Sequence, residues 1–123
     1  MNKNIELIFV YNADAGIFSV VSDFAHKILS PNTYACNLCK LTYGAFSMNK
    51  EWKEFLDKLL YKKEFLHKDE FQKKYPQMIN LLLPAVLIRS DGEMKEFLTQ
   101  QEINAQSDLR GLMSIFEQKL REL

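Results

Sequence analysis

Apolar and polar residues follow two different periods at the start of the chain. Residues Ile5–Tyr11 form a short, almost wholly apolar segment, as expected of a strand that is covered on both faces. Over residues 17–28 the apolar side chains recur at helical spacing. Pro31 ends that period, because a residue preceding proline avoids the α region. A strand followed closely by a helix is the first half of a β-α-β unit.

The rest of the chain continues this alternation after one aperiodic stretch. Residues 31–48 show neither the helical nor the strand period, so we expect an ordered loop there. Trp52 then leads the apolar face of a helix and is expected to lie in the core. The pattern next predicts a strand near the sheet edge at 61–67 and a short helix at 70–75 that Asp69 caps. A buried strand at 81–88, a hairpin turn at 90–93 and a returning strand at 94–99 follow. The chain then continues with a polar segment at 100–106 and a last helix capped by Ser107. This order indicates an α/β fold.

Composition narrows the range of partners. The chain has 123 residues with 16 basic and 16 acidic side chains, which predicts one domain over 1–123 and no attraction for nucleic acid or an anionic membrane. The longest apolar run, residues 81–88, contains Pro84 and is too short to span a bilayer. The N-terminal residues lack the pattern of a secretory signal. We therefore expect a cytoplasmic protein whose two cysteines meet a reducing environment.

The element order resembles the thioredoxin-like superfamily, and one residue strengthens the resemblance. Pro84 stands ahead of the predicted hairpin, where thioredoxin-like domains carry a proline with a cis peptide bond beside the active site. The resemblance implies a three-layer sandwich in which a central mixed sheet of about four strands has helices on both faces. It also implies a cis Leu83–Pro84 bond. A cysteine-bearing insertion at about 30–60 would be this chain's own addition to that plan.

The cysteine pair departs from the pattern of that family. Thioredoxins place Cys-x-x-Cys at the start of the first helix, directly after the first strand, where this chain has NADAG at 12–16. Cys36 and Cys39 lie beyond the predicted helix at 17–28. We therefore expect that the helix N-terminus, which stabilises a thiolate in thioredoxins, does not act on Cys36.

A second resemblance rests on short motifs. The segments YNADAG at 11–16 and YACNLCKLTYG at 34–44 are similar to those of a family of short bacterial proteins without an assigned activity. Some of those proteins carry a GTPase label. This chain lacks the Gly-x-x-x-x-Gly-Lys-Ser/Thr loop that cradles phosphates, and its four glycines are too few to build one. The sequence therefore argues against GTP hydrolysis.

The Cys-x-x-Cys spacing permits thiol–disulfide chemistry. In this interpretation Cys36 is the nucleophile and Cys39 resolves the mixed disulfide, with Lys40 as the nearest cation. The reaction needs no cofactor and takes a protein or a small thiol as partner. Asn12 and Asp14 follow the first strand, at the edge where α/β domains bind ligands. Together with Pro84 they are candidate substrate-binding residues, although Asp14 is also explained as a helix cap.

Two other interpretations of the cysteines remain open. In the first, Cys36 and Cys39 bind zinc together with His26 and His67, the two histidines of the chain, at spacings that match no standard zinc finger. In the second, the pair only packs inside a non-enzymatic domain that binds a partner. The sequence names neither that partner nor the oligomeric state.

Overall fold

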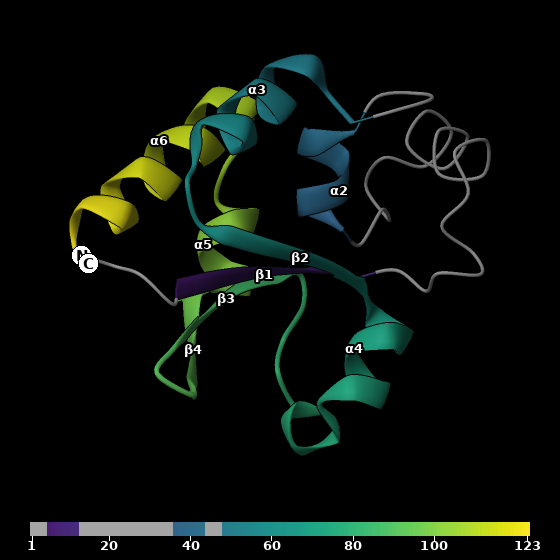
Figure 1. Ribbon diagram of the computed structural model, residues 1–123. Coiled ribbons are helices and arrows are strands. Elements are labelled where there is room, and N and C mark those ends of the chain that lie inside the picture. Colours follow the sequence, from purple (N-terminus) through teal and green to yellow (C-terminus); the bar gives the residue numbers. More distant parts are fainter. Residues whose placement is uncertain (1–4, 13–35, 44–47) are drawn as a thin grey trace, which may run out of the picture.

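A four-stranded mixed sheet forms the centre of the protein. A computed structural model describes residues 5–12, 36–43 and 48–123, and the helix predicted at 17–28 lies outside these ranges. The strand order is β2-β1-β3-β4 (Figure 1). The strands are β1 (Ile5–Tyr11), β2 (Lys62–His67), β3 (Ala85–Ser90) and β4 (Glu93–Leu98). β2 runs parallel to β1, whereas β3 is antiparallel to both β1 and β4. The prediction of an α/β fold is confirmed.

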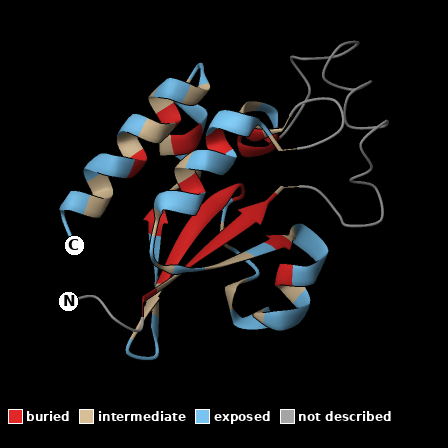
Figure 2. Ribbon diagram, turned by 45° about the horizontal axis from the view of Figure 1, so that its top comes forward, coloured by how far each residue is buried: buried red, intermediate tan, exposed pale blue. Residues whose placement is uncertain are grey.

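Strand β1 is central because both of its faces are apolar. Every residue of the strand except Glu6 is buried, and β1 and β3 are the most buried strands in Figure 2. Because side chains alternate along a strand, Leu7, Phe9 and Tyr11 face one side of the sheet. Ile8 and Val10 face the other side. The sheet is therefore enclosed between two separate cores.

The larger core lies on the side that we call the aromatic face. The helices that cover it are α2 (Asn37–Thr42), α3 (Lys50–Lys58), α5 (Gln100–Asn104) and α6 (Leu109–Arg121). Phe116 is at the centre of this core, with ring centroids 5.8 Å from Phe9 and 6.0 Å from Trp52. Trp52 is 1% exposed, which confirms its expected place in the core.

The smaller core lies on the opposite side, which we call the α4 face. Helix α4 (Lys68–Lys74) and the 3-10 turn η2 (Pro76–Met78) cover it, and Phe71 is the aromatic residue buried at its centre. Arg89 borders this core, where it pairs with Glu6 at 3.1 Å and donates a hydrogen bond to the hydroxyl of Tyr75. No helix within the described ranges combines the length and apolar character needed to cross a membrane.

Helix α4 begins earlier than the sequence pattern predicts. The sequence predicts Asp69 as the cap of a helix over 70–75, whereas in the structure His67 is the N-cap. The carboxylate of Glu70 accepts a hydrogen bond from the backbone N–H of His67 at 2.8 Å and contacts the imidazole Nδ1 at the same distance. This reciprocal capping fixes the start of the helix directly at the end of β2, leaving no loop between them.

The hairpin prediction is confirmed, whereas the cap of the last helix is not Ser107. Asp91 and Gly92 have φ values of 54° and 83°, the left-handed pair that a two-residue turn between twisted strands requires. Asp108 caps α6, because its carboxylate accepts the N–H of Gly111 at 2.8 Å. Neighbouring residues with similar capping ability make the exact start difficult to predict.

The buried strand predicted at 81–88 begins only at Ala85. Leu82, within the predicted run, is 62% exposed and precedes the sheet. The Leu83–Pro84 peptide bond is cis, as the resemblance implied. Proline has no backbone N–H to donate to a neighbouring strand, so regular pairing starts after it.

Candidate functional site

Cys36 and Cys39 are joined by a disulfide at the start of helix α2. Their sulfur atoms are 2.10 Å apart and their Cα atoms 5.2 Å apart. Cys36 is the N-cap of α2, and Cys39 lies in the helix. The prediction of a loop over 31–48 is therefore wrong for residues 37–42. A helix of six residues is too short to display an apolar period.

The chain returns to the end of strand β1 at Cys36. The backbone N–H of Asn12, which directly follows β1, points to Cys36 Sγ with a nitrogen–sulfur distance of 3.4 Å. The backbone N–H of Cys39 donates to the same sulfur at 3.1 Å. The helix predicted at 17–28 lies outside the described residues, so the expectation that its N-terminus does not act on Cys36 stays a prediction. The N-terminus of a different helix, α2, adjoins Cys36. Hydrogen bonds of this kind stabilise negative charge on sulfur when the pair is reduced.

The disulfide forms part of the core on the aromatic face. Cys36 is 1% exposed and Cys39 is fully buried, and the intervening Leu38 is buried beside them. Lys40, by contrast, lies on the exposed side of α2. The sequence suggested Lys40 as the cation nearest the sulfur atoms, but the groups that approach Cys36 Sγ are backbone amides.

Asn37, between the cysteines, anchors α2 to a distant part of the chain. Its side-chain amide donates to the carbonyl oxygen of Ile103 at 2.8 Å and to that of Gln106 at 3.0 Å. Sequence reasoning missed this role. The partners lie 66 and 69 residues away, and the local pattern around an asparagine carries no information about them.

Two tyrosines adjoin the disulfide end of β1. The ring of buried Tyr11 meets that of Tyr43, the C-cap of α2, edge to face at a centroid distance of 5.9 Å. The ring of His67 also contacts that of Tyr11, with a centroid distance of 5.8 Å. Burial, followed by the charge and hydrogen bond of Tyr43, raises the pKa of Tyr11 far above its ordinary value. Tyr11 therefore remains a neutral phenol at every physiological pH.

The structure brings some of the predicted substrate contacts to this end of the sheet. Val10 pairs with Ala85, so Pro84 lies at the same end as Asn12. Pro84 is buried. Asn12 contacts the disulfide through its backbone N–H. Asp14 lies outside the described residues, and the proposed ligand contacts of all three residues stay predictions.

The zinc interpretation depends on residues that the structure only partly describes. His67 lies at the end of β2, beside Tyr11 in the sheet register, and contacts Glu70. His26 lies outside the described residues. Within the described part of the chain, no three or more His, Cys, Asp or Glu side chains form a group able to hold a metal ion. The four-ligand set of His26, His67 and the two cysteines stays a prediction.

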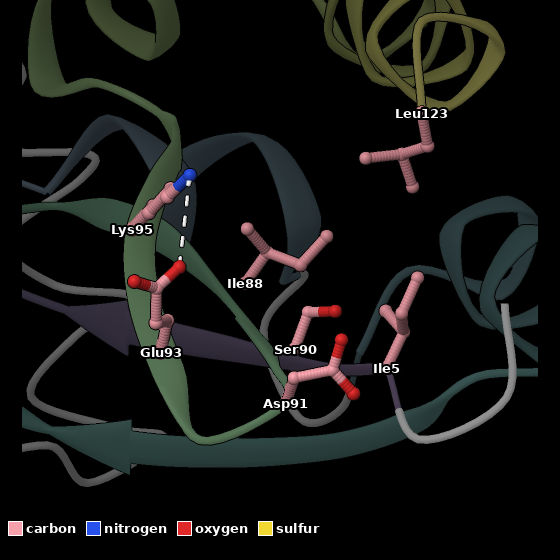
Figure 3. A pocket seen from close by; sticks show the side chains of 7 residues that line it. All are labelled: Ile5, Ile88, Ser90, Asp91, Glu93, Lys95 and Leu123. Carbon is pink, nitrogen blue, oxygen red and sulfur yellow. Dashed lines mark ion pairs between the residues drawn. The ribbon is translucent and has the colours of Figure 1, made fainter.

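A hollow at the opposite end of the sheet has a different character. It has a volume of about 500 Å³ and lies between the start of β1, the β3–β4 hairpin and the C-terminal residue (Figure 3). Its charged residues include Glu93 and Lys95, whose carboxylate and ammonium groups are 3.9 Å apart. Ile5, Ile88 and Leu123 supply apolar surface. Among the described residues the lining contains neither a thiol nor an imidazole, so the disulfide end remains the candidate site for chemistry.

Comparison with known proteins finds no match for this chain among family models, curated proteins or solved structures. The function is therefore inferred from the residues of the site. They are the Cys36–Cys39 disulfide, the two backbone N–H groups on Cys36 Sγ, and the phenol of Tyr11.

Proposed function

We propose that the protein is a thioredoxin-like thiol–disulfide redox protein that acts through Cys36 and Cys39. One observation carries this proposal: the disulfide lies at the end of the central strand, with Cys36 Sγ beside the N–H groups of Asn12 and Cys39. The strand order β2-β1-β3-β4 supports the resemblance from which the proposal starts.

The proposed reaction exchanges one disulfide for another. In the reduced protein, the Cys36 thiolate attacks the disulfide of a partner protein or of an oxidised small thiol, forms a mixed disulfide and releases one partner thiolate. The Cys39 thiolate then attacks Cys36 Sγ, which closes the Cys36–Cys39 bond and releases the second partner thiolate. The two cysteines lose two electrons and two protons, and the partner disulfide gains them. Reduction by a cellular dithiol reverses the sequence.

The division of roles follows from the hydrogen bonds. Cys36 Sγ is the sulfur that accepts both N–H groups, so it is the better stabilised thiolate and the nucleophile. Cys39 lies within α2 and is fully buried, which suits attack on the neighbouring Cys36 rather than on a partner.

The reduction potential tests the proposal. We expect glutathione buffers to convert the disulfide to the dithiol at a potential above about −300 mV, within reach of cellular thiol pools. After reduction, iodoacetamide should modify Cys36 before Cys39. Equal reactivity of both thiols, at the rate of an ordinary free cysteine, would contradict the assignment.

Two single substitutions provide a matched control. Cys39→Ser removes the resolving thiol, so a partner disulfide should become trapped on Cys36 and be visible by mass spectrometry. Cys36→Ser removes the nucleophile and should trap no adduct. Trapping at equal levels in both variants would show that the two cysteines do not have distinct roles.

The burial of both cysteines favours a second candidate function. Buried cysteines react slowly, and a structural disulfide fits a non-enzymatic domain that binds a partner. This candidate predicts a potential below about −300 mV and no trapped adduct in Cys39→Ser. If the cysteines of this non-enzymatic domain instead bind zinc, protein purified under reducing conditions should contain stoichiometric zinc and should lose stability on chelation.

A further inference from the structure

Helix α5 contacts both sides of the candidate redox site. On one side, the Asn37 amide donates to the carbonyl oxygen of Ile103 in α5 and to that of Gln106 just beyond the helix. On the other side, the Gln100 amide donates to the carbonyl oxygen of Leu83, which precedes Pro84, at 3.1 Å. The same short helix thus touches the turn that carries the cysteines and the segment that leads into β3.

Helix α5 is itself held in place by several independent contacts. Thr99 Oγ1 accepts the N–H of Glu102 at 3.1 Å, and the Glu102 carboxylate accepts the N–H of Thr99 at 3.0 Å. The carboxylate also pairs with Lys119 of α6 at 2.9 Å. Ile103 is fully buried in the core of the aromatic face. These contacts make α5 a fixed support for the groups that bind to it.

The position of Asn37 gives its two hydrogen bonds a specific consequence. Asn37 is the first residue of α2 and directly follows Cys36. Both N–H donors of its amide are used; one acceptor, Ile103, belongs to α5, and the other, Gln106, lies just beyond the end of that helix. Holding Asn37 therefore holds the N-cap, and with it the place of Cys36 Sγ beside the N–H groups of Asn12 and Cys39.

We propose that Asn37 is a positioning residue of the Cys36–Cys39 redox couple, an inference that rests on the proposed function. When the disulfide is reduced, the covalent link that keeps Cys36 at the N-cap is gone. The Asn37 contacts with α5 then keep Sγ in reach of the two backbone N–H groups, which stabilise the Cys36 thiolate. Stabilising the thiolate favours the reduced form, so Asn37 raises the reduction potential.

Two substitutions of Asn37 test this role. Asn37→Ala removes both donors, and Asn37→Asp keeps the size but replaces donors by a carboxylate that faces two carbonyl oxygens. In each, we expect the equilibrium with glutathione to shift about tenfold toward the disulfide, equal to about 30 mV for a two-electron couple. We also expect the ultraviolet absorbance of the Cys36 thiolate to appear at higher pH.

Asn49→Ala is the matched control. Asn49 caps α3, and its side chain also makes two hydrogen bonds, accepting the N–H groups of Glu51 and Trp52. Its loss should lower the urea midpoint as Asn37→Ala does, because a lost cap costs about 1 kcal/mol. It should leave the potential and the thiolate absorbance unchanged.

The outcomes separate this inference from the proposed function. Wild-type potential in the folded Asn37 variants, or an equal shift in Asn49→Ala, would overturn the positioning role while the redox function stands. A wild-type potential below about −300 mV would overturn the redox function itself. If Asn37→Ala does not fold, the isosteric Asn37→Asp decides the outcome by the same two measurements.

Discussion

The two faces of the sheet are covered by cores of different size and composition. On the aromatic face, four helices bury a continuous set of rings around Phe116, and the Cys36–Cys39 disulfide belongs to that core. On the α4 face, one helix and a turn cover a smaller, mainly aliphatic core. The candidate chemistry is therefore built into the main source of stability. Among the described residues, the disulfide and Tyr11 belong to the aromatic face and not to the α4 face.

The border of the α4 face shows a second difference. Charged side chains line it, with Arg89 between Glu6 and Tyr75 and with Lys74 paired to Glu64. Among the described residues, one carboxylate oxygen of Glu64 is buried without a hydrogen-bond partner. Such an oxygen retains a desolvation cost, so this border adds less stability than its number of charges suggests.

The largest effect should come from truncating the central ring of each core. Phe116→Ala should lower the free energy of unfolding by about 3–5 kcal/mol, and Phe71→Ala should fall at or below the lower end of that range. Both side chains are almost fully buried, at 0% and 1% exposure, so the pair is matched. Phe116 touches four other rings, whereas Phe71 packs against Tyr75. Urea unfolding followed by Trp52 fluorescence measures both. Equal losses would remove the contrast between the faces.

Reduction of the disulfide should have the next largest effect. Opening a loop of this length should lower the free energy of unfolding by about 2 kcal/mol, because the unfolded chain regains freedom. The truncations of the two cores should respond differently to reduction. Phe71→Ala should lose the same stability with and without reductant, since its core is separate from the cysteines. Phe116→Ala should lose different amounts in the two states. Additive losses in both variants would contradict the link between the disulfide and the aromatic face.

Acid should weaken the capped helix of each face to a different extent. Burial acts to raise the pKa of Glu102, but hydrogen bonds from Thr99 and the ammonium of Lys119 outweigh it and lower the pKa. Hydrogen bonds from His67 lower the pKa of Glu70. A carboxyl with a lowered folded-state pKa stabilises the fold above its ordinary pKa, and the contribution disappears as pH falls through the folded-state value.

The pH dependence can be assigned with two substitutions. Between about pH 5 and pH 3, the free energy of unfolding should fall less steeply with decreasing pH in Glu102→Gln than in Glu70→Gln. The reason is that Glu102 also pairs with Lys119 of α6. Thermal unfolding across this range measures the difference. A larger effect of Glu70→Gln would show that the α4 cap, and not the α5 cap, dominates acid unfolding.

The smallest effect should come from the charged border of the α4 face. Glu6→Gln removes the partner of Arg89 and should cost less than about 1 kcal/mol, with the cost falling as salt is added. Urea midpoints at low and high salt measure this. A cost that equals that of Phe71→Ala would show that the border, and not the apolar core, holds α4 in place.

Local patterns predicted most of the elements because those elements are long or sharply marked. The apolar run of β1, the stripe of α3 led by Trp52 and the Asp91-Gly92 turn all carry their signal within a few residues. Helix α2 was missed because six residues hold less than two helical turns. The cap of α4 was missed because His67, which is not among the preferred capping residues, is held by Glu70.

The cysteine pair of the candidate site could be singled out from the sequence, but its place in the fold could not. The spacing of Cys36 and Cys39 allowed a disulfide, a metal site or inert packing, and the structure contains the disulfide. Their return to the end of β1 depends on the contact of Cys36 with Asn12, and no periodicity encodes a contact between residues so far apart. Asn37 was missed for the same reason, since its partners lie on α5 and just beyond it.

The contact between Asn12 and Cys36 also ties two distant positions of the chain together. They are 24 residues apart, and each is held independently, one by the sheet and the other by α2. A displacement of Cys36 Sγ therefore reaches the end of the central strand through one hydrogen bond, which makes the Asn12 amide a direct reporter of the cysteine pair.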